Sequence, residues 1–224
     1  MKKSTVAAFV VILGIIGAAG YALFARSAKA QEPNATAKKS FQSSILLDGD
    51  IIFQSSKAGQ SYAVQLATHS PYSHVGLVYI IDGSYWVYEA VQPVRLTPLS
   101  NWIHHGDGGH YIVKRLKNRD QVLTSEKVQE MKAIGKRFNG LDYDLHFGWS
   151  DDRMYCSELV WKIYHEALGV DIGQLQTLRE FDLTHPVVKE IVEKRYGNDV
   201  PLDETVISPA AIFASDKLVT VQEK

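Results

Sequence analysis

The sequence has a single cysteine, Cys156, among its 224 residues. One thiol excludes an intramolecular disulfide framework, and it excludes zinc or iron–sulfur sites that need several cysteines. Hydrophobic residues make up 46% of the chain and charged residues 22%, which excludes the disordered, collagen-like and coiled-coil classes as its main description. The length fits one large globular domain or two small ones.

Positive charge is scarce outside the N-terminus. Residues 1–30 contain four basic side chains and no acidic one, whereas residues 31–224 contain 20 basic and 25 acidic side chains. A mildly acidic body is poorly suited to nucleic acids, because neutralising phosphates requires clustered Lys and Arg. We therefore expect no nucleic-acid partner.

The N-terminus has the pattern of a targeting segment. A lysine pair precedes an uncharged run of 21 residues, 5–25, and the small-x-small pattern at 28–30 is suited to cleavage before Gln31. The run is also long enough to span a bilayer, so residues 1–30 are either a cleaved signal peptide or a single membrane anchor. In both cases the positive-inside rule places the body outside the cytoplasm. We expect an exported, periplasmic or otherwise extracytoplasmic protein, with residues 31–44 as a polar linker.

Residues 45–224 form the predicted folded domain, which combines short strands with helices. Asp82-Gly83 between two β-rich runs is a strong hairpin signal, and Thr124 and Gly140 are suited to begin and end a helix. The pattern predicts an α+β domain with a small, mainly antiparallel sheet packed by helices. The expected strands are 51–54, 74–81, 85–90 and 111–116, and the expected helices are 60–68, 124–138, about 153–168, and two that begin near Pro186 and Pro209.

Cys156 falls in the first turn of the helix predicted from about Arg153. Capping candidates at 150–152 precede it, and Leu159 and Val160 put its sulfur on the buried face of that helix. A helix N-terminus favours the thiolate, which is the reactive form of cysteine. A small apolar side chain on a buried face would have the same geometry, so position alone leaves both interpretations open.

His74 and Glu89 are the expected partners of the thiol. If Asp82-Gly83 forms a two-residue turn, the strand alternation puts both side chains on one face of the hairpin as diagonal neighbours. A carboxylate there can orient the imidazole and hold the tautomer that accepts a proton from the thiol. The alternative is a surface histidine with a solvated glutamate on an edge strand. The helix-start cysteine and the hairpin alternation together favour a functional pair.

Three motifs in this region resemble the NlpC-like cell-wall peptidases, a papain-like superfamily. Residues 155–160 (YCSELV) are similar to their cysteine-bearing helix start, 140–144 (GLDYD) to the segment before it, and 73–76 (SHVG) to their histidine strand. The histidine precedes the cysteine here, which is the order of the circularly permuted branch that includes relatives of lecithin–retinol acyltransferase. Within that branch the sequence resembles the YiiX-like proteins over nearly all of residues 45–224, which implies a permuted papain-like fold.

The resemblance also implies roles for particular residues. Cys156 would be the nucleophile, His74 the base and Glu89 the third polar residue, and the hydroxyl of Tyr143 would form the oxyanion hole together with the backbone N–H of Cys156. Asp142 stands where the family segment has proline. Further candidates for substrate contact are Tyr155, Glu158 and His69, although Glu158 is equally suited to complement the helix dipole and His69 to cap the helix at 60–68.

These observations lead to the hypothesis of an extracytoplasmic cysteine hydrolase or acyltransferase that works through a Cys-His-Glu triad and an acyl-enzyme. The substrate would be an amide in a cell-wall peptide or an acyl ester or amide of a lipid, and a membrane anchor would favour the lipid. No cofactor is expected, and no metal site either, because His104, His105 and His110 fall in a glycine-rich loop. The alternative is a catalytically silent module that binds a small molecule or peptide in a papain-like cleft.

Overall fold

The structure is a computed structural model, and it describes residues 46–224. The predictions for the targeting segment and the linker lie outside the described residues. Within residues 46–224, no helix is both long enough and apolar enough to cross a membrane.

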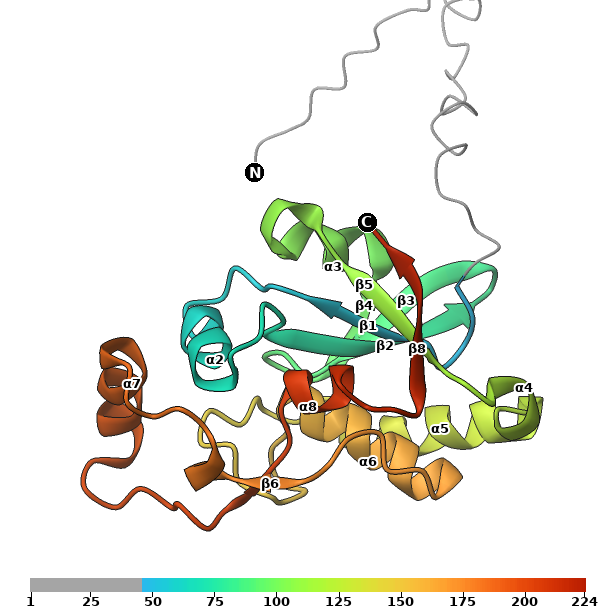
Figure 1. The fold of residues 1–224 in the computed structure, drawn as a ribbon. Coiled ribbons are helices and arrows are strands. Elements are labelled where there is room, and N and C mark those ends of the chain that lie inside the picture. Colours follow the sequence, from blue (N-terminus) through green and yellow to red (C-terminus); the bar gives the residue numbers. More distant parts are fainter. Residues whose placement is uncertain (1–45) are drawn as a thin grey trace, which may run out of the picture. The chain divides into compact units, whose positions relative to one another are not determined.

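An antiparallel sheet of six strands forms the centre of the domain (Figure 1). Its strand order is β4-β3-β2-β1-β5-β8, so the β2–β3 hairpin lies between β4 and β1, and the C-terminal strand forms one edge. A separate two-stranded ribbon joins β6 and β7. The strands are β1 (Ile51–Gln54), β2 (His74–Ile81), β3 (Ser84–Glu89), β4 (Arg95–Pro98), β5 (Ile112–Leu116), β6 (Gln176–Thr177), β7 (Thr205–Val206) and β8 (Leu218–Glu223).

Helices cover both faces of this sheet. The helices are α2 (Ser61–Thr68), α3 (Leu99–His105), α4 (Arg119–Val122), α5 (Ser125–Phe138), α6 (Cys156–Leu168), α7 (Pro186–Tyr196) and α8 (Pro209–Phe213), with short 3₁₀ turns at Asp107–Gly109 and Leu178–Glu180. Helices α5 and α6 pack together, and α6 lies against β2, whereas α3 contacts β3 and β4. Helix α7 contacts α2 at the other end of the molecule (Figure 1).

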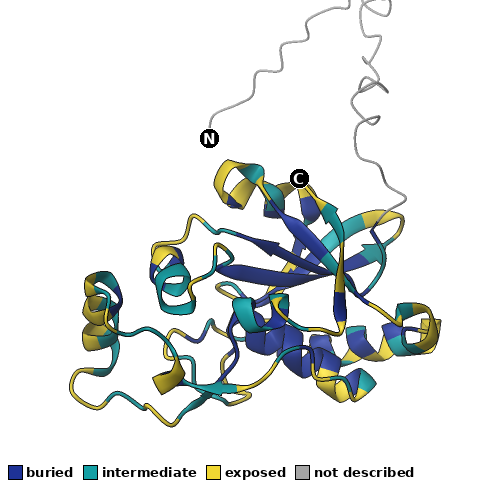
Figure 2. Cartoon of the chain, viewed as in Figure 1, coloured by how far each residue is buried: buried dark blue, intermediate teal, exposed yellow. Residues whose placement is uncertain are grey.

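Two apolar clusters correspond to the two faces. Side chains of β2 that point to opposite faces of the sheet belong to different clusters. Val75 and Leu77 pack into the cluster with α6, whereas Val78 packs with Trp102 of α3. Burial on both faces explains why β1 and β2 are nearly continuous runs of apolar residues. Figure 2 shows that α6 and the central strands are the most deeply buried elements. The fold is therefore α+β, as the sequence predicts.

The hairpin prediction is confirmed in detail. Ile81 pairs with Ser84, so Asp82 and Gly83 form the two-residue turn, and both have positive φ values of 50° and 74°. Such values are typical of the tight turns that connect twisted antiparallel strands. Since the turn fixes the register, it also determines which side chains of β2 and β3 share a face.

The predicted start of the cysteine helix is wrong by three residues. Helix α6 begins at Cys156 with Tyr155 as its N-cap, rather than near Arg153. The preceding chain is extended because Met154 pairs with Tyr143 in an isolated β-bridge. The capping candidates at 150–152 therefore do not cap the helix, and the carboxylate of Asp151 binds Lys162 instead. Cys156 becomes the first residue of the helix.

Candidate active site

Cys156 lies where the first turn of α6 meets the end of the sheet. Its side chain is buried, with 4% of the residue exposed, and it shares a hydrogen bond with the His74 side chain. The backbone N–H groups of Val75 and Ser157 also contact the sulfur. The first amides of a helix have no intrahelical partner, so the N–H of Cys156 itself is available to an oxygen atom placed beside the sulfur.

His74 and Glu89 are brought together as the hairpin alternation predicts. The Nε2 atom of His74 lies 2.6 Å from Oε2 of Glu89, and both side chains are buried. This contact leaves Nδ1 as the ring nitrogen that faces the thiol. Thr97 on β4 donates its hydroxyl to Oε1 of Glu89 at 2.6 Å, and the indole of Trp102 stacks on the imidazole at 5.9 Å between ring centroids. Glu89 thus fixes the Nε2 edge of the imidazole, and Trp102 packs against the plane of the ring.

The electrostatics of this group favour a thiolate–imidazolium pair. Burial alone would lower the pKa of His74, but its hydrogen bonds to Cys156 and Glu89 outweigh burial and raise the pKa to about 10. Burial would also raise the pKa of Cys156, yet the His74 hydrogen bond and charge lower it below its ordinary value. The His74 contact likewise lowers the pKa of Glu89 in spite of burial. All three shifts describe the same charge distribution, in which Cys156 and Glu89 are negative and His74 is positive.

Tyr143 reaches the sulfur from the segment that precedes α6. Its side chain shares hydrogen bonds with Cys156 and with Gln60, and burial raises its pKa well above the ordinary value. The phenol therefore keeps its proton at neutral pH and can donate it. The backbone N–H of Tyr143 donates to Oε1 of Gln92 at 2.7 Å, and the amide of Gln92 also binds the carboxylate of Asp142. Asp142 thus anchors the segment in the place where the family has proline.

A cleft of about 760 Å³ opens beside these residues. Its wall contains the buried side chains of His74 and Glu89 together with Tyr143, and it also contains the exposed side chains of Lys57, His104 and His105. No group of three or more His, Cys, Asp or Glu side chains within residues 46–224 comes together so that it could hold a metal ion. The cleft reaches His74 and Tyr143, the two side chains that share hydrogen bonds with Cys156, whereas Cys156 itself lies behind them and is not part of the wall.

The three further substrate-contact candidates lie elsewhere. His69 is the left-handed C-cap of α2, is exposed and lies 3.5 Å from the carboxylate of Asp182, outside the cleft wall. Tyr155 is buried, and its hydroxyl accepts the N–H of Ile207 at 3.1 Å. The structure therefore gives His69 a capping position, whereas Tyr155 lies outside the catalytic cleft but in the wall of an apolar pocket.

The structure also places Glu158, the third candidate for substrate contact, outside the cleft wall. Its side chain is completely buried, pairs with the Lys162 ammonium at 2.8 Å and accepts the backbone N–H of Tyr155 at 3.4 Å. Burial raises the pKa of Glu158 to about 7 even though Lys162 opposes this shift. The carboxylate stabilises the first turn of α6, and because it has no exposed surface it does not contact a substrate in this conformation.

Several residues of the site gave no signal in the sequence. Thr97 and Trp102 belong to β4 and α3, two elements that the sequence patterns did not predict, and Gln60 reaches Tyr143 from the start of α2. Finding them would have required the pairing of β4 with β3, since Thr97 lies opposite Val87 and beside Glu89.

Comparison with known proteins gives a consistent result. Residues 46–222 match the family described as permuted papain-like amidase enzymes, YaeF/YiiX, C92 family. The protein YiiX of Escherichia coli strain K12, described as uncharacterized, is 49% identical over 176 residues, which cover 79% of this chain and 86% of YiiX. A crystal structure described as the metalloprotein YiiX from Escherichia coli O157:H7 is 48% identical and superposes with a TM-score of 0.77, covering 80% of this chain and 98% of the other.

Proposed function

The chain belongs to the family of permuted papain-like amidases, and from this premise we propose that it is an extracytoplasmic cysteine hydrolase or acyltransferase with a Cys156–His74–Glu89 triad. Membership makes it a papain-like cysteine hydrolase in general terms. The observation that carries the finer proposal is the buried chain of contacts from the sulfur of Cys156 through the imidazole to Glu89. A buried cysteine with only a packing role would not need a neighbouring imidazole that is hydrogen-bonded to a carboxylate.

The proposed reaction proceeds in two steps. The thiolate of Cys156 attacks the carbonyl carbon, a C–S bond forms, and the carbonyl oxygen becomes an oxyanion that the Tyr143 hydroxyl and the Cys156 N–H stabilise. The His74 imidazolium then gives its proton to the departing nitrogen or oxygen as that bond breaks, leaving a thioester. In the second step water, or another acceptor, attacks the thioester carbon while His74 takes its proton. The C–S bond then breaks, the acyl group leaves on the acceptor as a carboxylic acid or a transferred acyl product, and the thiolate–imidazolium pair is restored.

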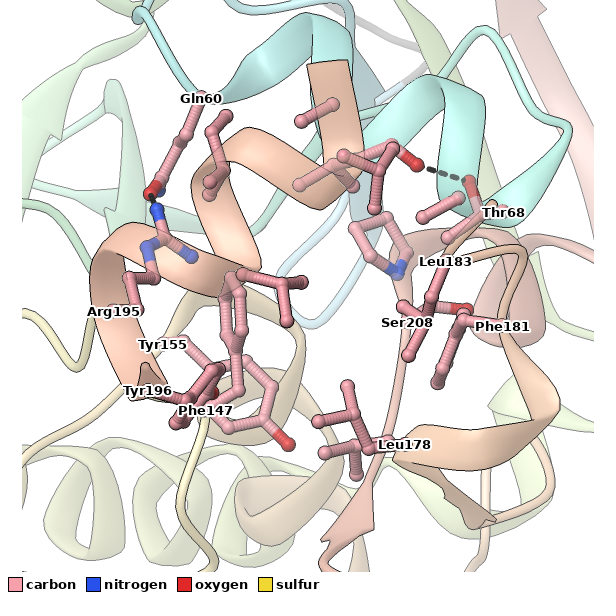
Figure 3. Close-up of a pocket in the computed structure, with 18 residues that line it drawn as sticks. Gln60, Thr68, Phe147, Tyr155, Leu178, Phe181, Leu183, Arg195, Tyr196 and Ser208 are labelled. Carbon is pink, nitrogen blue, oxygen red and sulfur yellow. Dashed lines mark hydrogen bonds between the residues drawn. The ribbon is translucent and has the colours of Figure 1, made fainter. Parts of the chain in front are cut away.

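An apolar pocket beside the cleft supports a substrate with a hydrocarbon group. It is lined by apolar side chains of α2, α7 and the neighbouring loops, among them Val64, Ala67, Phe147, Leu178, Phe181 and Val188. Its volume is about 100 Å³, and Gln60 is among the residues that line it (Figure 3). Gln60 also belongs to the wall of the catalytic cleft. Apolar walls of this kind favour an acyl chain or a large apolar side chain. An amide or ester of a lipid is therefore our first substrate class, and a cell-wall peptide is the second because the family is described as amidases.

A substrate panel tests this proposal. We expect the full-length protein in mild detergent to hydrolyse at least one substrate among N-acyl amides, phospholipids and purified wall peptides, with products identified by mass spectrometry. The same preparation with Cys156→Ala is the control, because a contaminating hydrolase would act equally in both. Absence of turnover on all three classes would overturn the catalytic proposal.

The extracytoplasmic location rests on residues 1–30, whose charge and hydropathy pattern is that of an export signal or anchor. A fusion of residues 1–44 to an alkaline phosphatase that is active only after export is expected to be active in bacterial cells. Deleting residues 5–25 from the same fusion should abolish that activity. A full-length fusion that accumulates without phosphatase activity would contradict the location.

A metal has no part in this proposal. The Escherichia coli relative is described as a metalloprotein, but the described residues of this chain contain no cluster of His, Cys, Asp or Glu donors suited to an ion. Among the histidines, His74 is committed to Glu89, and His165 pairs with the carboxylate of Asp171 at 2.7 Å. Because the donor set does not fit, we derive no step through a metal.

A further inference from the structure

Gln60 belongs to the wall of both the catalytic cleft and the apolar pocket. Gln60 is the residue before α2, at the N-cap position of that helix. The amide oxygen accepts a hydrogen bond of 2.7 Å from Nη2 of Arg195, and Figure 3 shows the two side chains pointing toward each other. Arg195 comes from the last turn of α7, which is 135 residues away in the sequence.

The bond to Arg195 fixes which end of the amide faces the active site. An arginine has no acceptor, so the carbonyl oxygen of Gln60 must face the guanidinium, and the NH₂ group is left for the hydroxyl of Tyr143. Tyr143 then accepts from Gln60 and retains its own proton for the sulfur of Cys156, with which it shares a second hydrogen bond. Each group therefore donates a hydrogen bond to the next: Arg195 to the Gln60 amide, the amide to the Tyr143 hydroxyl, and the hydroxyl to the sulfur.

The surroundings of Arg195 hold the guanidinium in place. Its side chain is half-buried and lies over the ring of Phe147, 5.3 Å from the ring centroid. Burial lowers the pKa of Arg195, yet guanidinium remains charged at neutral pH. A positive charge at one end of a hydrogen-bond chain polarises every bond in it, and the effect is stronger where water is excluded.

We propose that Gln60 and Arg195 are positioning residues of the oxyanion hole, which aim the Tyr143 hydroxyl at the reacting oxygen and make it a stronger donor. The inference rests on the proposed function, since it concerns the same reaction. Removing one oxyanion-hole donor typically lowers kcat by about 10²–10³-fold. Because Gln60 and Arg195 act through Tyr143, their loss should lower kcat by less, about 10- to 100-fold, with little change in KM.

The sharpest variant is Gln60→Glu, which keeps the size of the side chain and its bond to Arg195 but removes the NH₂ donor. The phenol of Tyr143 would then donate to the carboxylate instead of to the oxyanion, so kcat should fall toward the value of Tyr143→Phe. Arg195→Met should lower kcat by leaving the amide free to turn, and Arg195→Lys should restore part of it. Lys194→Met is the matched control, because this exposed neighbour on the same helix has no part in the chain of contacts.

A double-mutant cycle separates positioning from a general effect on folding. In the Tyr143→Phe background, Gln60→Glu and Arg195→Met are expected to cause no further loss of kcat. Losses that multiply with that of Tyr143→Phe, while the wild-type protein turns over substrate, would overturn this inference and leave the proposed function intact.

If the wild-type protein turns over none of the substrates, the proposed function fails and the same cycle is measured with iodoacetamide labelling of Cys156. Tyr143→Phe, Gln60→Glu and Arg195→Met should each raise the pH midpoint of labelling, because each weakens a hydrogen bond to the thiolate. The double variants should not raise the midpoint beyond that of Tyr143→Phe. A midpoint that none of the three single variants moves would overturn the inference.

Discussion

Replacing Cys156 by alanine is expected to reduce turnover of the substrate found in the panel by about 10⁴-fold or more. Removal of the nucleophile of a triad leaves only the catalysis that substrate binding and the oxyanion hole provide. The wild-type protein, quenched with acid during turnover, should carry one acyl group on residue 156, and the variant none. Kinetics together with the mass of the intact protein measure both quantities.

Cys156→Ser is the matched control, since it keeps a side chain of nearly the same size. A serine hydroxyl stays protonated beside His74, so we expect its activity to be close to that of the alanine variant even though the site keeps its shape. If the Cys156→Ala protein turned over substrate at the wild-type rate, the proposal of a catalytic triad with Cys156 as nucleophile would be contradicted. A wild-type protein that binds the panel molecules without turnover, with the same affinity as Cys156→Ala, would instead favour the alternative of a binding module.

The central geometry of the site could be predicted because it depends on local rules. The turn at Asp82-Gly83 fixes the register of one hairpin, and strict alternation then places His74 and Glu89 on one face. Cys156 could be placed at a helix start from the apolar spacing that follows it. The error of three residues arose because a β-bridge between Met154 and Tyr143, a non-local contact, keeps the chain extended up to the helix.

The residues around this core could not be predicted, since tertiary contacts bring them together. The hydrogen bond between Gln60 and Arg195 joins residues from two helices near opposite ends of the domain's sequence. The strand Leu218–Glu223 is half exposed at the sheet edge, so it lacks the run of apolar residues that reveals a central strand. The apolar pocket forms only where α2 and α7 meet. Periodicity in a single sequence carries no information on such pairs.

The second large effect concerns the pH at which Cys156 reacts. Because the pKa of Cys156 is lowered, its thiolate persists as the pH falls below the ordinary thiol value of about 8.5. The raised pKa of His74, about 10, keeps the imidazolium charged throughout this range. We therefore expect iodoacetamide to label the wild-type protein at pH 6.5 faster than it labels the His74→Ala variant, because a larger fraction of the thiol is ionised in the wild type. With one cysteine in the chain, the mass of the labelled protein reports on this thiol alone.

His74→Ala removes the cation and leaves a thiol in a buried site. Burial then raises the pKa of Cys156, so the thiolate fraction at pH 7 falls to a few per cent or less and labelling slows by about 30-fold or more. Labelling should recover only as the pH rises above about 9. A His74→Ala protein that labels at pH 6.5 like the wild type would show that another group stabilises the thiolate, and His74 would lose its role as the base.

Glu89→Gln separates the charge of the third residue from its position. Thr97 donates a hydrogen to the side chain at 89, so the glutamine oxygen should face Thr97 and its NH₂ group should face Nε2 of His74. That arrangement forces the neutral imidazole to carry its proton on Nδ1, toward the sulfur, where it cannot accept another. The corresponding tautomer change in a serine triad lowers kcat by about 10⁴-fold. We therefore expect Glu89→Gln to lose turnover and low-pH labelling together, whereas loss of neither would mean that Glu89 only packs beneath the imidazole.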